Sequence, residues 1–241
     1  MKISTYDPIN TLKPVNRDIW IVDGPVIHFK KVPFQTRMTV IRLKSGDLFV
    51  HSPTALTEAL KAEIDRLGPV RHLISPNKIH YWWIGEWGEA YPDALKWASP
   101  GVRPSARKQG WDFDRELGEI AESAWREDID QLVVHGGRFM DEVVFFHRRS
   151  RSLILADLIE NFELRMVHSP ILKWLLKLAG NCDPDGKLPI DLRLSFWGRH
   201  GQISRAVNRM LEWAPERIIL AHGRWYPSNG VAELRRAFRW V

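Results

Sequence analysis

The sequence predicts an α+β fold in which two mixed β-sheets lie inside and helices lie outside. Short apolar runs bounded by turn residues recur along the chain, which is typical of buried strands. Other stretches carry apolar residues at helical spacing. The order is strands, helix, strand, helix, strands, helices, strand, helix. Layers with the sheets inside and the helices outside bury the apolar face of every such element.

The first fifty residues predict an antiparallel meander of four strands. Turn residues separate the apolar runs, with Asp23-Gly24 after the first and Lys44–Asp47 before the last. Short connections of this kind favour antiparallel neighbours. The predicted strands are Asp18–Val22, Pro25–Phe29, Arg37–Leu43 and Leu48–His51.

A helix is predicted next, starting at Ser52-Pro53. Serine favours the N-cap position and proline the first helical position. One apolar stripe follows at spacings of four, four and three residues, and Gly68-Pro69 ends it. The stripe consists of Leu56, Leu60, Ile64 and Leu67. A short strand, Val70–Ile74, then leads through a loop into a second helix that runs through Trp87.

The second half of the chain predicts four more strands and four helices. Apolar runs rich in Val, Ile, Leu and Phe are the strands, and the second and third of them form a hairpin. The predicted strands are Leu132–His135, Glu142–His147, Ser152–Asp157 and Arg217–Ala221, and the predicted helices are Pro170–Leu178, Asp191–Trp197, Ile203–Trp213 and Val231–Trp240. Pro170–Leu178 is apolar nearly all round, which fits either a core helix or the face of a homodimer.

Composition predicts one globular domain spanning residues 1–241. The net charge of +6 comes from dispersed Lys and Arg, so a nucleic-acid partner is not expected and a small-molecule ligand is. The single cysteine excludes an internal disulfide and fits a reducing compartment. The N-terminus has no signal-peptide pattern, and no apolar run is long enough to span a membrane. A cytoplasmic location is therefore expected.

Four side chains that can bind a metal follow predicted strands directly or within a few residues: His80, His135, Asp157 and His222. Three imidazoles and a carboxylate suit one Zn or Fe ion with an open coordination position. Each residue also has a structural alternative, because Asp157 fits a helix N-cap and a histidine can simply end a strand. His51 is a further candidate at a strand end.

Three of these segments resemble the metallo-β-lactamase-like hydrolase superfamily. They are Val134-His135-Gly136, Ala156-Asp157 and Leu220-Ala221-His222-Gly223. The resemblance implies a four-layer αββα sandwich with a metal site between its two sheets. The superfamily's H-x-H-x-D-H motif is largely missing, because Pro76 and Lys78 stand at its first two histidines and His80 at its aspartate. The resemblance therefore implies one metal ion and not two.

A closer resemblance is to the domain-of-unknown-function family DUF4336. The matching segments are Gly46–Pro53, Ser75-Pro76-Asn77 with His80, Tyr91–Ala94, Glu142–His147, Ser152–Asp157, Ala221-His222-Gly223 and Ala237–Trp240.

These resemblances imply a metal-dependent hydrolase acting on an ester, lactone, thioester or phosphoester. Asp157 would be catalytic, as a ligand or as the group that orients the attacking water. Lys78 and Arg138 would bind the substrate. The alternative is a non-catalytic member of the fold, without a metal, that binds a small anionic ligand or a protein partner through the same two cations.

Overall fold

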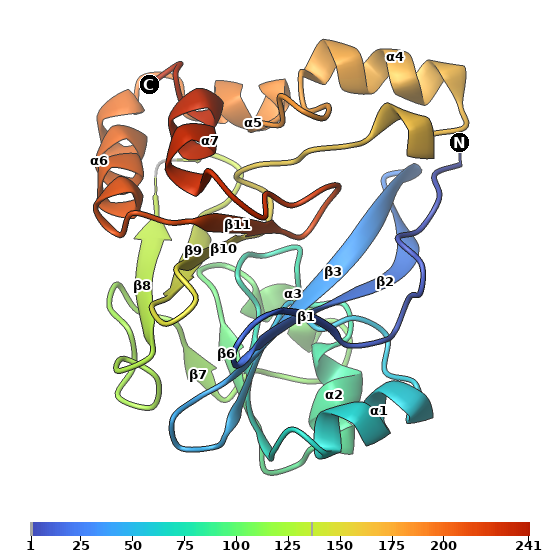
Figure 1. Ribbon diagram of the computed structural model, residues 1–241, viewed down its shortest axis with the longest axis vertical. Helices are drawn as coiled ribbons and strands as arrows, with labels where there is room; N and C mark the ends of the chain where they lie inside the picture. The colour runs from blue at the N-terminus through green and yellow to red at the C-terminus, as the bar shows by residue number, and fades with distance from the viewer. Residues whose placement is uncertain (1, 136) are drawn as a thin grey trace.

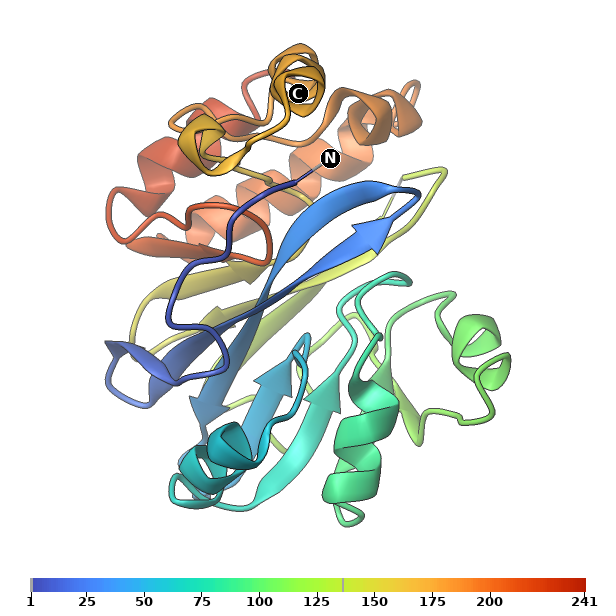
Figure 2. The ribbon, with the colours of Figure 1, turned by 90° about the vertical axis from the view of Figure 1, so that its right-hand side faces the viewer.

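The computed structural model describes residues 2–135 and 137–241, and it confirms two mixed β-sheets between outer helices. Figure 1 shows the two sheets in the middle of the molecule, with α1 and α2 on one side and α6 and α7 on the other. Figure 2 shows the same layers after a quarter turn. No helix in the described part of the chain has the length and apolar character needed to cross a bilayer.

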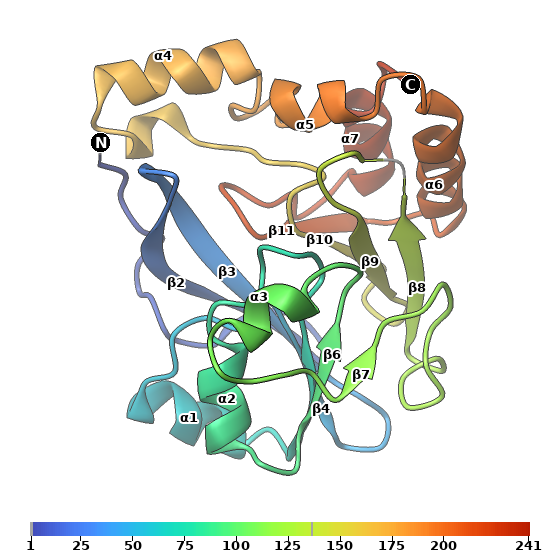
Figure 3. The same cartoon turned by 180° about the vertical axis from the view of Figure 1, so that it is seen from behind.

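The larger sheet has seven strands in sequence order, from β1 to β7. They are β1 (Lys13–Asn16), β2 (Ile19–Phe29), β3 (Val32–Arg42), β4 (Leu48–His51), β5 (Val70–Ile74), β6 (Leu95–Ala98) and β7 (Arg115–Glu116). Strands β1 to β4 are antiparallel, which confirms the predicted meander for β2, β3 and β4, and β4 to β7 are parallel. Figure 3 shows the parallel strands from behind.

The smaller sheet has four strands in the order β11-β10-β9-β8. They are β8 (Ile129–Val134), β9 (Glu142–His147), β10 (Ser152–Leu155) and β11 (Arg217–Leu220). Strand β9 is antiparallel to both β8 and β10, whereas β10 and β11 are parallel. The carboxyl ends of β10 and β11 therefore meet at one edge of the sheet, and this edge carries the candidate site.

Eight helical segments connect and cover the two sheets in the described part of the chain. They are α1 (Glu58–Asp65), α2 (Ile84–Ala90), α3 (Arg103–Arg107), η1 (Leu164–Met166), α4 (Pro170–Ala179), α5 (Ile190–Ser195), α6 (His200–Glu212) and α7 (Gly230–Ala237).

Three apolar cores separate the layers. The core between the sheets contains Phe49 and Ile74 from the larger sheet, Phe145 and Ile219 from the smaller one, and the fully buried Trp125. A second core packs α1 and α2 on the larger sheet, and a third packs α6 and α7 on the smaller sheet. Each sheet is thus apolar on both faces, which is what a four-layer arrangement requires.

Several predicted element boundaries are wrong, and β3 starts at Val32 and not at Arg37. Asp18–Val22 and Pro25–Phe29 are not separate strands, because β2 continues through Gly24 with an irregular register up to Ile27. A side chain at Gly24 would collide with Thr54, so this position tolerates only glycine. Helix α1 does not start at Ser52-Pro53. Its N-cap is Thr57, whose hydroxyl accepts the hydrogen bond of the Leu60 N–H.

Helix α4 is not the core helix that its sequence allows. Only Leu172 and Leu176 are buried, in a small core with Phe162 and Val167. Ile171 and Trp174 are 68% and 60% exposed. The helix therefore lies on the surface with an apolar outer face, and the homodimer stays a prediction.

Candidate metal centre

In the described part of the chain, one group of three side chains brings metal-binding atoms within 4.8 Å of one another: His80, Asp157 and His222. His80 Nε2 lies 3.1 Å from Asp157 Oδ2, and His222 Nε2 lies 3.3 Å from Asp157 Oδ1. The two imidazole rings are tilted against each other with centroids 5.1 Å apart. One carboxylate thus holds two histidines, one through each oxygen.

The topology explains why Asp157 and His222 meet. Strands β10 and β11 are parallel neighbours, with Leu155 paired to Leu220. Neighbouring strands lie about 5 Å apart, so side chains two residues beyond these paired ends can touch. His80 comes from the other sheet, in the loop between β5 and α2. The group therefore lies where the two sheets face each other.

The outer nitrogen of each imidazole is held by the protein. His222 Nδ1 donates to the backbone carbonyl of Gln35 at 2.6 Å, and His80 Nδ1 shares a hydrogen bond with Ser52 Oγ at 2.7 Å. Such bonds fix the orientation and the tautomer of a metal-binding histidine. Ser52 reaches His80 because the chain turns sharply after β4, with a positive φ of 50° at this residue.

The chemistry of the inner atoms calls for a proton or a metal ion between them. Because the carbonyl of Gln35 only accepts, the proton of a neutral His222 stays on Nδ1 and the Nε2 lone pair faces a carboxylate oxygen. Two acceptors at this distance need a proton or a metal ion between them. Zn–N and Zn–O bonds of about 2.1 Å place tetrahedral ligands about 3.4 Å apart. The observed 3.1 and 3.3 Å, each to a different oxygen of Asp157, are close to that spacing.

A second carboxylate, Glu142, supports Asp157 from behind. Its two oxygens accept the backbone N–H groups of Ala156 and Asp157 at 2.8 and 2.7 Å. The amide of Asn77 donates to Asp157 Oδ2 at 2.6 Å and to Glu142 Oε2 at 3.2 Å. Asn77 Oδ1 also accepts the N–H of His80 at 3.2 Å. These bonds fix Asp157 and His80 relative to each other.

Burial and charge shift the pKa values in this group in opposite directions. Burial by itself raises the pKa of Asp157, but the neighbouring His80 and His222 outweigh it and hold that pKa far below its usual range. Burial lowers the pKa of His222, yet the bond to Asp157 and the charge of that carboxylate produce a net rise. Burial and then the charge of Asp157 raise the pKa of Glu142. Asp157 is thus the more acidic of the two carboxyl groups.

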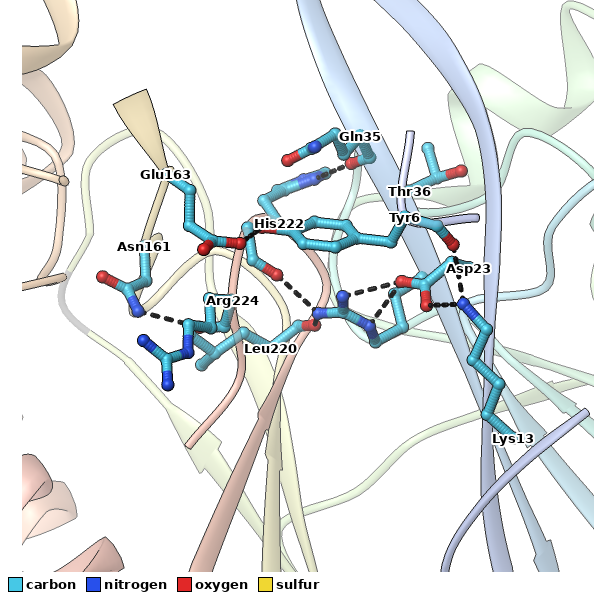
Figure 4. Close-up of polar contacts among 12 residues, drawn as sticks. Tyr6, Lys13, Asp23, Gln35, Thr36, Asn161, Glu163, Leu220, His222 and Arg224 are labelled. Atoms are coloured by element: carbon cyan, nitrogen blue, oxygen red, sulfur yellow. Dashed lines mark hydrogen bonds and ion pairs between the residues drawn. The ribbon is translucent and has the colours of Figure 1, made fainter. Parts of the chain in front are cut away.

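A buried ion pair holds the turn that carries His222. Arg37 on β3 donates to both carbonyls that flank this turn, Leu220 O at 2.8 Å and Gly223 O at 2.7 Å. Its other nitrogens contact Asp23 Oδ1 at 2.6 and 2.8 Å. Figure 4 shows this network between Asp23 and Lys13 on one side and Leu220 and His222 on the other. Arg37 therefore ties the larger sheet to the His222 turn.

A cavity of about 640 Å³ opens on the group, and His80, Asp157 and His222 all line it. Its walls come from the β2–β3 hairpin, the loop before α2, and helices α4 and α5. Glu160 also lines the cavity, and Asn181 donates to Glu160 Oε2 at 2.6 Å. Burial raises the pKa of Glu160 to about 8. The site thus combines a low-pKa carboxylate with a carboxyl group that holds its proton near neutral pH.

His135 lies outside this group. It follows β8, and its ring bonds Glu119 Oε1 at 2.6 Å and Asp141 Oδ2 at 2.9 Å. Its side chain is 44% exposed, and the hydrogen bond to Glu119 raises its pKa. His51 is buried against Phe145 and is not part of the group either.

The two predicted substrate-binding cations are not among the described residues that line the cavity. Lys78 Nζ sits 4.0 Å above the ring of Phe139, which lines the cavity, and Arg138 is exposed. Asp157 is not a helix N-cap, because residues 156–159 form bends and no helix follows them.

Sequence reasoning missed the residues that hold the group: Gln35, Ser52, Asn77, Glu142 and Glu160. Gln35 acts through its backbone carbonyl, which leaves no trace in the side-chain pattern. Ser52 was predicted as a helix cap. Glu142 offered the one usable signal, since a charged residue that opens an otherwise apolar strand must find partners when buried.

Comparisons with known proteins agree with this geometry. Residues 16–173 match the family model described as Domain of unknown function (DUF4336). No curated protein matches the chain in sequence. Several solved metallo-beta-lactamases have a similar structure along nearly the whole chain.

The metallo-beta-lactamase from Hirschia baltica is 18% identical, with a TM-score of 0.62 over 95% of this chain and 96% of that chain. The one from Erythrobacter litoralis is 10% identical, with a TM-score of 0.63 over 100% of both. FIM-1 from Pseudomonas aeruginosa, in its mono-zinc form, is 12% identical, with a TM-score of 0.61 over 99% of this chain and 95% of that chain. The chain thus has the metallo-β-lactamase fold and belongs to the DUF4336 family.

Proposed function

We propose that this protein is a metal-dependent hydrolase with one divalent ion, Zn²⁺ or Fe²⁺, held by His80, Asp157 and His222. The observation that carries the proposal is the convergence of three donor atoms at the cavity, with both imidazoles fixed from behind by Ser52 and Gln35. Three protein ligands leave a coordination position open, which is typical of catalytic and not of structural sites. The mono-zinc form of the Pseudomonas aeruginosa protein supports one ion on this fold.

A bound ion would polarise a substrate carbonyl or phosphoryl oxygen and make water a stronger nucleophile near neutral pH. The protein's own residues divide the remaining work. Asp157 binds the ion and is the predicted catalytic carboxylate. The hydrogen bond from Asn77 fixes its orientation. Glu160 keeps a proton close to the cavity. Lys78, whose amine lies over the ring of Phe139, adds positive charge for a polar part of the substrate.

Metal content tests the proposal directly. We expect about one equivalent of Zn or Fe in the purified protein, measured by elemental analysis after incubation with excess metal and dialysis. His222→Ala should lose it. His135→Ala is the matched control, since this histidine also follows a strand of the smaller sheet but binds Glu119 and Asp141 instead. Circular dichroism should show that both variants fold.

The result that would overturn the proposal is a wild-type protein that takes up no metal. A proton would then bridge His222 and Asp157, and the fold would serve as a binding protein without hydrolytic chemistry. Equal metal loss in the two variants would assign the ion to a different ligand set.

A further inference from the structure

The cavity above the candidate metal centre is polar at one end and apolar along its walls. The polar end holds Ser52, Asp157 and His222. The β2–β3 hairpin contributes apolar side chains to one wall, and α4 contributes others to the opposite wall. Those that matter below are Ile27, Phe29, Phe34, Leu172, Leu175 and Leu176. One end suits a reacting polar group, and the rest suits hydrocarbon.

Charge around the cavity disfavours an anionic substrate. Among the described lining residues, Lys30 is the one lysine and there is no arginine, whereas Asp157 and Asp191 are acidic and Glu160 holds its proton near neutral pH. A sugar or a nucleotide would bury hydroxyl or phosphate groups against apolar walls that offer no partners, which is costly. A volume of about 640 Å³ is ample for a drug-sized apolar molecule.

The entrance is apolar as well. Leu175 and Leu178 line the cavity and are also 40% and 58% exposed, so α4 carries the apolar lining outward to the surface. Figure 1 shows α4 lying across the top of the molecule, above the end of the β2–β3 hairpin. An apolar chain can therefore enter between these two elements, where Lys30 is the one charged residue of the described lining and its amine lies over the rings of Phe29 and Phe139.

We propose that the substrate is a neutral ester with a long acyl chain, which fills the apolar part of the cavity while its carbonyl lies at His80, Asp157 and His222. This inference rests on the proposed hydrolase function. In the reaction, the water oxygen bonds to the acyl carbon, the bond from that carbon to the alcohol oxygen breaks, and a proton passes to the departing oxygen. The products are a long-chain carboxylic acid and an alcohol.

Binding of 1-alkanols tests the cavity independently of catalysis, because these molecules are neutral and are not hydrolysed. Isothermal titration calorimetry with the 1-hexanol, 1-octanol and 1-decanol series should show Kd falling by up to about fourfold per added methylene. Leu175→Glu should flatten this dependence by placing a charge at the entrance. Leu194→Glu is the matched control, because Leu194 is a similarly exposed leucine on α5 that does not line the cavity.

Three outcomes separate the two proposals. A Kd that does not change with chain length, or that responds equally to both leucine variants, would overturn the acyl-chain assignment. If the protein binds metal and yet shows no preference for long chains, the hydrolase proposal stands and the substrate class is wrong. If alkanols bind with the expected dependence in a protein that takes up no metal, the cavity is a lipid-binding site and the hydrolysis is wrong.

If the protein binds both the metal ion and the long-chain alkanols, hydrolysis of p-nitrophenyl esters provides the final check. We expect KM to fall from the acetate to the decanoate in the metal-loaded protein, and we expect Leu175→Glu to abolish that trend. A KM that is lowest for the acetate would contradict the proposal.

Discussion

His222 and His135 follow opposite edge strands of the same four-stranded sheet, and their surroundings differ completely. Strand β11 is the parallel neighbour of β10, so His222 lies beside Asp157. Strand β8 is two strands away from β10, across β9, which is a separation of about 10 Å. His135 consequently finds Glu119 and Asp141 in place of the central carboxylate. Strand order, and not the presence of a strand end, decides which histidine can join a metal site.

The ion pairs beside these two edge strands also differ in burial. The turn after β11 is fixed by Arg37, whose side chain is 3% exposed and pairs with a buried aspartate. On the β8 side, Arg148 pairs with Asp130 at the end of β8 away from His135, and Arg148 is 49% exposed. A buried, hydrogen-bonded pair restricts the position of a turn, whereas an exposed pair contributes little to stability.

The largest effect that would test this comparison is on stability. Arg37→Met should lower the free energy of unfolding by about 3 kcal/mol, because it leaves Asp23 buried with one remaining partner, Lys13, and removes the donor from two buried carbonyls. Arg148→Met should change it by less than about 0.5 kcal/mol. Guanidinium denaturation with an unchanged m-value measures both. Equal losses in the two variants would mean that Arg37 does not hold the His222 turn.

A smaller effect is expected on metal affinity. Asn77→Ala removes the donor that orients Asp157, so Zn²⁺ should bind about 10- to 100-fold more weakly. Asn181→Ala is the control, because the side-chain amide of Asn181 donates to Glu160 and not to Asp157. Competition titrations with a chromophoric chelator measure both affinities. If the two asparagine variants bind Zn²⁺ equally well, the hydrogen bond from Asn77 does not position Asp157 for metal binding.

Periodicity alone predicted much of the fold, because long apolar runs are buried wherever the strands pair. It found β4, β5 and the strands of the smaller sheet. It missed β7, whose two residues Arg115 and Glu116 are exposed and carry no apolar signal. It also missed β1, a short edge strand with alternating exposure. Short edge strands gain their structure from the neighbour that they pair with, and a single sequence does not reveal that neighbour.

The site was less predictable for a related reason. Strand ends identified His222 and Asp157, but they gave His135 equal weight because the order of the strands was unknown. Ser52 precedes a proline and therefore has the local pattern of a helix cap. Its actual role depends on the sharp turn after β4, which brings its hydroxyl to His80. Contacts between the two sheets, such as those of Asn77, have no local pattern at all.

Buried histidines and His135 should affect the stability of the protein differently as the pH is lowered. Burial lowers the pKa of both His72 and His147 to about 4. The unfolded chain then binds more protons than the folded protein between pH 6.5 and 4, so stability is full above pH 6.5 and falls as the pH decreases. His147→Gln should reduce the loss between pH 7.5 and 5.5 by about 1 kcal/mol. An unchanged pH dependence of the denaturation midpoint in this variant would contradict the expectation.

The contribution of His135 to stability should change with pH in the opposite direction, and its effect should be the smallest. Hydrogen bonds to Glu119 and then Asp141 raise its pKa, so its contribution to stability is complete below pH 6.5 and is lost as the pH rises through the higher value of the folded protein. His135→Gln should therefore destabilise the protein at pH 5.5, by no more than about 0.5 kcal/mol because these groups are largely exposed, and should have no effect at pH 8.5.

An NMR titration of the imidazole signals provides the direct measurement. The midpoint of His135 should lie above 6.5 and that of His147 well below it, with each signal assigned by its Gln variant. A low midpoint for His135 would mean that its two carboxylate partners are not in contact with it in solution.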